Sequence, residues 1–166
     1  KVASANADNP AMTTRLRYTG IPGLEIGGSF QYQDDITAGA AVTSNSATLF
    51  EGHIDWKHGS GFGLRALYAQ WDLDNQLSIA GDDKQYGYYI EPAYRFRAGA
   101  LPGEMGVFAR WSELEYGDVN EEERFRVGLN YWPTNQVAFK FDWTNVDDTD
   151  DNTSADSLNL GLGYQF

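Results

Sequence analysis

Basic residues are spaced along this chain in a way that suits the binding of anions. Arg124 and Arg126, for example, flank Phe125. Because residues two apart on a β-strand point to the same face, both guanidinium groups would lie on one surface. A guanidinium group binds phosphate or carboxylate through two parallel hydrogen bonds. The candidate anion-binding residues are Arg15, Arg17, Arg65, Arg95, Arg97, Arg110, Arg124, Arg126 and Lys140.

The acidic residues are distributed differently, and they give the chain a net charge of -12. Those inside the expected strands, at the same parity as the basic residues, are Glu25, Glu51, Asp55, Glu91, Glu104 and Asp142. Apart from Asp8, the others gather in or beside the expected long loops, at 34–35, 72–83, 113–123 and 147–156. This distribution predicts a basic wall with an acidic entrance, and rings of basic residues favour anions. The alternative is that acids such as Glu91 and Asp142 pair with arginines only to hold the wall together.

Apolar residues alternate with small or polar residues along much of the chain. From Leu158 to Phe166 every second residue is apolar, which is the period of a strand whose two faces meet different surroundings. The same pattern predicts strands at 12–20, 24–33, 48–58, 62–72, 84–97, 104–112, 123–132, 137–144 and 157–166. No run approaches the roughly 18 to 20 consecutive apolar residues of a membrane-spanning helix. The expected fold is therefore all-β.

The expected connections alternate between short and long. Short turns at 21–23, 59–61, 98–103 and 133–136 alternate with long loops at 34–47, 73–83, 113–122 and 145–156. Bacterial outer-membrane barrels have this layout, with the short turns on the periplasmic side. A soluble up-and-down sheet has no reason to sort its loops by length. We therefore expect a transmembrane antiparallel up-and-down β-barrel.

The apolar faces of the expected strands carry aromatic residues toward their ends. The faces in strands five, seven and eight are Tyr86, Tyr88, Ile90, Pro92, Tyr94 and Phe96; Phe125, Val127, Leu129 and Tyr131; and Val137, Phe139, Phe141 and Trp143. Aromatic girdles of this kind mark the two interfaces of a membrane. The alternative is a β-sandwich core, which would have to bury many tyrosine hydroxyls with a partner for each.

Nine strands are an odd number, whereas bacterial single-chain barrels have an even number. An open sheet would also leave unpaired edges in lipid, which is not tolerated. We therefore expect residues 1–166 to be the C-terminal portion of one larger barrel domain. Residues 1–11 would form a tail in an external loop, and a missing N-terminal part would close the barrel.

Four segments, 63–71, 85–96, 128–133 and 160–166, resemble the C-terminal half of the phosphate-selective porin O and P family. The terminal pattern of Tyr164 and Phe166 resembles the signal that the outer-membrane assembly machinery reads. The family resemblance implies a porin of about 16 strands, usually a homotrimer, that passes small anions without chemistry. The family's constriction also uses the N-terminal half. The resemblance therefore leaves phosphate-like anions as candidates and does not carry over phosphate specificity.

Other chemistry receives little support from the sequence. Asp148, Asp150 and Asn152 are similar to the start of a calcium loop, but the sixth position lacks glycine and the twelfth is Asn159. A solvated acidic loop is the preferred interpretation, with weak divalent bridging to lipopolysaccharide phosphates as a secondary role. His53 and His58 are isolated, and only His53 has the parity of the basic residues.

Catalysis and nucleic-acid binding are not expected. No nucleophile stands beside a recognisable base, and no pair of carboxylates suits glycosidase chemistry. We therefore expect no enzyme activity and no cofactor. The basic residues alternate along strands and do not form an exposed patch, which argues against a nucleic-acid partner.

The sequence as a whole predicts an integral porin of the bacterial outer membrane. It would allow passive diffusion of small hydrophilic solutes, with a preference for anions, and its surroundings would be lipid and lipopolysaccharide. The alternative is a small structural or receptor barrel that binds a partner through acidic external loops. A plugged lumen without conductance would favour that alternative.

Overall fold

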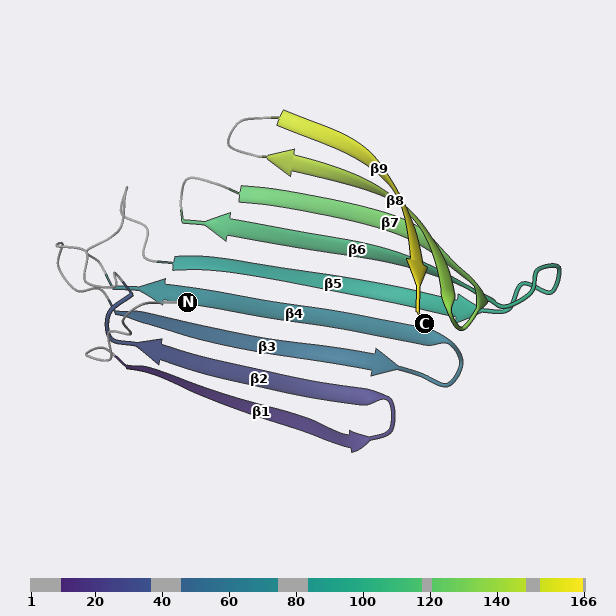
Figure 1. Ribbon diagram of the computed structural model, residues 1–166. Helices are drawn as coiled ribbons and strands as arrows, with labels where there is room; N and C mark the ends of the chain where they lie inside the picture. The colour runs from purple at the N-terminus through teal and green to yellow at the C-terminus, as the bar shows by residue number, and fades with distance from the viewer. Residues whose placement is uncertain (1–9, 37–45, 75–83, 118–120, 149–152, 166) are drawn as a thin grey trace, which may run out of the picture.

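The computed structural model describes residues 10–36, 46–74, 84–117, 121–148 and 153–165. Within these ranges the chain forms nine β-strands and no helix (Figure 1). The strands are β1 (Ala11–Ile21), β2 (Leu24–Gln33), β3 (Ala47–Lys57), β4 (Phe62–Leu73), β5 (Lys84–Phe96), β6 (Glu104–Tyr116), β7 (Glu121–Thr134), β8 (Val137–Asp148) and β9 (Thr153–Tyr164). In the described part of the chain, no helix is long and apolar enough to span a membrane.

Each strand pairs antiparallel with the next one along the chain, in the order β1 to β9. The prediction of nine strands in an up-and-down arrangement is therefore confirmed. Among the described residues the sheet does not close, since β1 pairs only with β2 and β9 only with β8. Both of these strands consequently present an unpaired edge.

Two of the connections that the sequence predicts as long loops, 113–122 and 145–156, are largely strand. The four strands concerned reach Tyr116 in β6, Glu121 in β7, Asp148 in β8 and Thr153 in β9. The ladder continues through pairs such as Glu115 with Glu121. Because acidic residues are rare in strands, the residue types did not indicate that these strands continue. The backbone groups of a hairpin can nevertheless form hydrogen bonds with each other whatever side chains are present.

The predicted tail at 1–11 is also slightly too long, since Ala11 begins β1. Residues 1–9 lie outside the described ranges, as do 37–45 and 75–83 from the other two predicted long loops.

Short turns connect the strands at one end of the sheet and depend on glycine at specific points. Gly61, between β3 and β4, has φ 94°, and Gly103, before β6, has φ 85°. A Cβ atom on Gly103 would stand 1.9 Å from the carbonyl oxygen of Trp132. The backbone conformation and the close approach of the neighbouring turn both require glycine there.

The antiparallel register sorts the side chains onto two chemically different faces. One face carries Ile26, Ile54, Ile90, Val107, Leu129, Phe141 and Leu160; Ile26 pairs with Ile54, and the last four follow one another as direct partners across β6 to β9. The apolar residues predicted for strands five, seven and eight all lie on it, as expected. Leu160 is 84% exposed, and Ala47 is the only buried hydrophobic residue in the described part of the chain. The sheet therefore has no hydrophobic core of its own.

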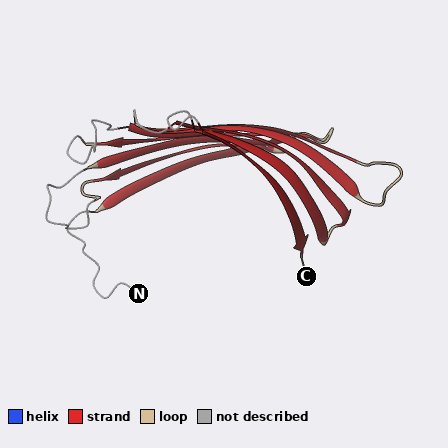
Figure 2. Ribbon diagram, turned by 90° about the horizontal axis from the view of Figure 1, so that it is seen from above, coloured by secondary structure: helices blue, strands red, loops and turns tan. Residues whose placement is uncertain are grey.

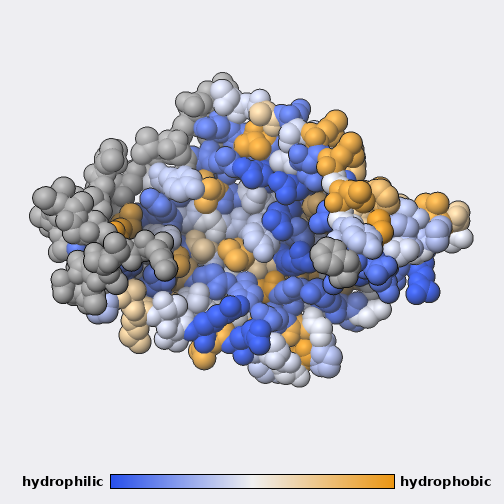
Figure 3. All heavy atoms as spheres, in the orientation of Figure 1, coloured by the Kyte–Doolittle hydropathy of each residue, from blue (hydrophilic) through white to orange (hydrophobic). Residues whose placement is uncertain are grey.

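The sheet is strongly curved, most of all at β8 and β9 (Figure 2). Its concave side faces the viewer in Figure 1, and the same view with all atoms shows mainly hydrophilic residues across the hollow (Figure 3). We call this polar side the concave face and the apolar side the convex face. The curvature thus places the apolar residues outside and the polar residues inside.

Candidate functional site

The nine basic residues predicted from the sequence all lie on the concave face. Arg110 pairs directly with Arg126, and Arg65 pairs with Glu91, so that neighbouring strands place their charges at the same level. Arg97 follows the end of β5 and reaches Glu104 on β6. Lys57 lies on the same face and was missing from the predicted set. Its position at the end of an alternating strand was the signal that could have included it.

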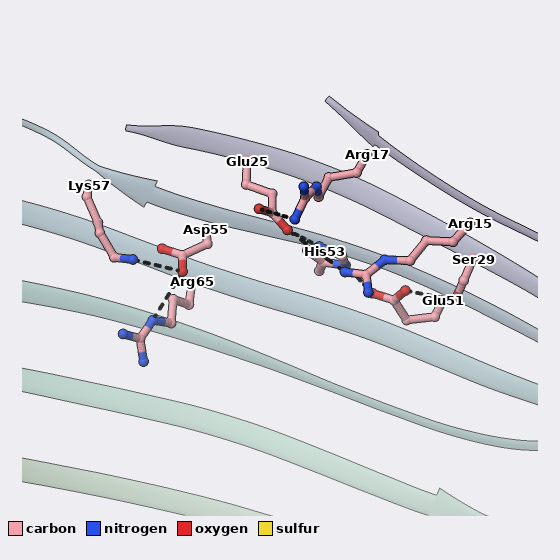
Figure 4. A network of polar contacts seen from close by, with 9 residues as sticks. All are labelled: Arg15, Arg17, Glu25, Ser29, Glu51, His53, Asp55, Lys57 and Arg65. Carbon is pink, nitrogen blue, oxygen red and sulfur yellow. Dashed lines mark hydrogen bonds and ion pairs between the residues drawn. The ribbon is translucent and has the colours of Figure 1, made fainter. Parts of the chain in front are cut away.

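A first cluster of polar contacts joins β1, β2 and β3 (Figure 4). The Glu25 carboxylate lies 3.9 Å from the Arg15 guanidinium and 3.7 Å from that of Arg17. Its Oε1 atom is also 3.3 Å from Nε2 of His53, while Nδ1 of His53 contacts Glu51. The Ser29 hydroxyl donates a hydrogen bond of 2.9 Å to Glu51. One carboxylate, that of Glu25, thus serves two arginines and a histidine.

A second group continues this network across β3, β4, β5 and β6. The Asp55 carboxylate contacts Lys57 at 3.3 Å and Arg65 at 3.9 Å. Arg65 also reaches Oε1 of Glu91 at 3.4 Å, and Arg110 reaches Oε2 of the same carboxylate at 2.7 Å. Residues of both clusters, among them His53 and Asp55, line one hollow of the concave face.

Aromatic rings support two of these guanidinium groups. Arg110 lies over the ring of Tyr89 at 4.3 Å from its centroid, and Arg95 lies over Trp132 at 4.6 Å. Arg95 also forms a salt bridge of 2.5 Å with Glu104. Stacking of this kind holds the guanidinium flat against the wall. The sequence alone does not reveal these partners, since Tyr89 lies on the strand next to that of Arg110 and Trp132 lies two strands away from Arg95.

The arginines of β7 have partners on β7 and β8. Arg124 forms an ion pair of 2.6 Å with Glu122. Arg126 donates to the Thr144 hydroxyl at 2.9 Å and lies 3.6 Å from Asp142. Pairing with Glu91 and with Asp142, which the sequence offered as an alternative role for the arginines, is therefore present in the structure.

Lys140 differs from the other predicted cations. It has no salt-bridge partner among the described residues, whereas each of the eight predicted arginines has one. It lies with Arg65, Arg110 and Arg126 on a hollow of 860 Å³ at the short-turn end of the concave face. The carboxylates of Glu91 and Asp142 also line this hollow, where Lys140 adds a positive charge that no carboxylate of the described residues pairs with.

Of the three predicted metal-binding residues, only Asp148 lies in the described ranges. Asp148 is the last residue of β8, and Asp150 and Asn152 lie outside the described ranges. Ligand oxygens of Glu113, Glu121 and Glu123 all come within 4.8 Å of one another, on the convex face at the opposite end from the short turns. These three carboxylates therefore lie beyond the apolar residues of the convex face, toward the end where the acidic segments are.

The residues of the predicted assembly signal are only partly described. Tyr164 ends β9 and is exposed on the convex face, opposite Val137, while Phe166 lies outside the described ranges. His58 lies in the turn after β3, where its Nδ1 atom is 2.8 Å from the Ser60 hydroxyl.

No family model matches this chain, and no curated protein matches it at a significant level. The geometry of the two faces is therefore the guide to function. The concave face offers fixed positive charges along a hollow surface, which can attract and guide anions. The convex face offers a broad apolar surface, and its acidic residues lie toward the end opposite the short turns.

Proposed function

We propose that the nine strands are part of a closed transmembrane β-barrel in the bacterial outer membrane. One observation carries this proposal: the convex side of the curved sheet is apolar and the concave side is polar. A water-soluble barrel has the reverse arrangement, because its core must be apolar. Lipid is the surrounding that stabilises an apolar convex face.

The unpaired edges of β1 and β9 support closure by further strands. Backbone groups at an open edge cannot be left without partners in lipid. Further strands, in a part of the barrel outside this chain, would supply those partners. The resemblance to the porin O and P family suggests about 16 strands in total and a homotrimer, surrounded by lipid and lipopolysaccharide.

We further propose that this barrel is a porin through which small hydrophilic solutes diffuse, with a preference for anions such as phosphate. Three carboxylates of the concave face, those of Glu25, Glu91 and Glu104, each contact two arginines. Because one carboxylate neutralises only one of the two arginines that it contacts, each such group leaves a net positive charge on the concave face. Lys140, which has no acidic partner among the described residues, adds to it.

Ion selectivity of the full-length protein in planar bilayers tests this proposal. We expect a reversal potential that indicates anion preference in a salt gradient. Replacing Arg124 and Arg126 with Ala should lower the anion/cation permeability ratio, because two cations leave the wall. Lys84→Ala is the control, since Lys84 pairs with Asp72 on the convex face. An unchanged reversal potential in the double variant would contradict the role assigned to the two arginines.

One observation favours a second function, that of a scaffold or receptor barrel. Every predicted arginine has a carboxylate partner, and such pairs can serve only to hold a wall together. In that case the acidic long-loop end would bind a partner. Absence of any conductance for the full-length protein would favour this function over the porin.

A further inference from the structure

Glu91 occupies a special position on the concave face. With 8% of its surface exposed, it is one of the few buried charged residues in the described part of the chain. Its two carboxylate oxygens have different partners: Oε1 lies 3.4 Å from Arg65 on β4, and Oε2 accepts from Nε of Arg110 on β6 at 2.8 Å. One side chain therefore links three neighbouring strands near the middle of the sheet.

The backbone ladder is interrupted at the same place. Pairing of β5 with β6 runs from Gln85 to Ile90 and resumes only at Ala93. Odd-numbered residues of β5 donate toward β4, as Arg95 does to Gly61. The missing N–H of Pro92 therefore falls on the β6 side, where no ladder hydrogen bond can form. The contact between Glu91 and Arg110 spans this gap.

We propose that Glu91 is a positioning residue that sets the anion preference of the wall by holding Arg65 and Arg110. This inference rests on the proposed porin function. Glu91 keeps both guanidinium groups against the sheet and neutralises part of their charge. The Tyr89 ring stacks on the Arg110 guanidinium and helps to hold it against the sheet. Without the carboxylate, Arg110 would lose its ion pair and Arg65 would keep only the longer contact of 3.9 Å with Asp55, so both guanidinium groups could extend further into the lumen.

The first part of the test measures positioning without any need for conductance. The full-length protein and its Glu91→Gln variant are treated with phenylglyoxal, which modifies accessible arginine, and each site is followed by peptide mass spectrometry. We expect the modification rates of Arg65 and Arg110 to rise by about threefold, within the range that loss of a partly exposed ion pair allows. Unchanged rates at both sites would overturn the proposal.

Glu104→Gln is the matched control. Glu104 is also shared by two arginines, Arg95 and Arg97, but its side chain is 32% exposed whereas that of Glu91 is 10% exposed. In this variant Arg95 and Arg97 should become more reactive, while Arg65 and Arg110 should not. A rise at all four sites in both variants would indicate general loosening of the barrel and would also overturn the proposal.

The second part of the test measures the reversal potential of the same variants. Glu91→Gln should raise the anion/cation permeability ratio more than Glu104→Gln does, since water screens a buried charge less. An equal or smaller change would overturn the role in selectivity. If no variant conducts but Arg65 and Arg110 still become reactive in Glu91→Gln, then Glu91 positions them and it is the porin proposal that fails.

Discussion

At the scale of single residues, the charges of the concave face are arranged by sharing. Glu25 contacts Arg15 and Arg17, and it also reaches Nε2 of His53. The sequence predicted that the arginines share a face, because alternation with apolar residues fixes parity. It could not predict which carboxylate each arginine meets, since a shift of register by two residues keeps the parity and changes every partner.

Glycine residues opposite rings give the concave face part of its shape. Gly27 pairs with His53, and a Cβ atom there would stand 2.4 Å from the ring carbon Cε1. Gly128 pairs with Phe108 in the same way. A ring that lies over a glycine takes less room from the hollow than one pushed outward by a side chain, which suits a surface along which solutes move.

Gly27→Ala should therefore destabilise the fold by about 1–3 kcal/mol, the usual cost of overpacking. The His53 ring would have to leave Glu25 and Glu51 to make room. Unfolding by denaturant in detergent, followed by tryptophan fluorescence, measures the difference. Gly52→Ala is the control, because a Cβ atom at Gly52 meets nothing within 4 Å, and it should be neutral or slightly stabilising. Equal stability of the two variants would contradict the proposed fit between ring and glycine.

At the scale of strands, the alternation of apolar residues predicted the number and order of the strands correctly, but it placed several strand ends too early or too late. All nine strands are present, but β6, β7, β8 and β9 extend into acidic segments that read as loops. Glu113, Glu115, Glu121 and Glu123 occupy every second position there and share the convex face with the apolar residues further along the strands. The period was therefore present in the sequence, but residue types that are rare in strands concealed it.

The strand β9 provides a sharp test of the proposed lipid contact. Leu160 lies on the convex face and its neighbour Asn159, which donates to Asp142, lies on the concave face. An arginine facing lipid near the middle of the membrane costs about 2–4 kcal/mol, and less toward the interfaces. Leu160→Arg should therefore reduce stability in lipid by an amount of this order.

Asn159→Arg is the matched control, because it places the same side chain one residue away on the polar face. It should change the free energy of unfolding by less than about 1 kcal/mol, as expected for a surface substitution. Folding of the full-length variants into lipid vesicles, measured as a function of denaturant, compares the two. Equal costs at both positions would contradict opposite surroundings for the two faces.

At the scale of the whole molecule, curvature and hydropathy are the two facts that point to the same function. The hollow side carries the charges and the outer side carries the large apolar residues. The sequence predicted two unlike faces, but period alone cannot say which one is concave. That property arises from the twist and bending of paired strands, and it is what separates a barrel in lipid from a soluble one.

The measurement that tests the central claim most directly is a scan of spin labels along β8. The chain contains no cysteine, so single cysteines can be placed at Phe139, Lys140, Phe141, Asp142 and Trp143 of the full-length protein in lipid vesicles. We predict that oxygen, which partitions into lipid, reaches the labels at 139, 141 and 143, and that a water-soluble nickel complex reaches those at 140 and 142. Equal access of the nickel complex to all five labels would contradict a convex face in lipid and a concave face in water.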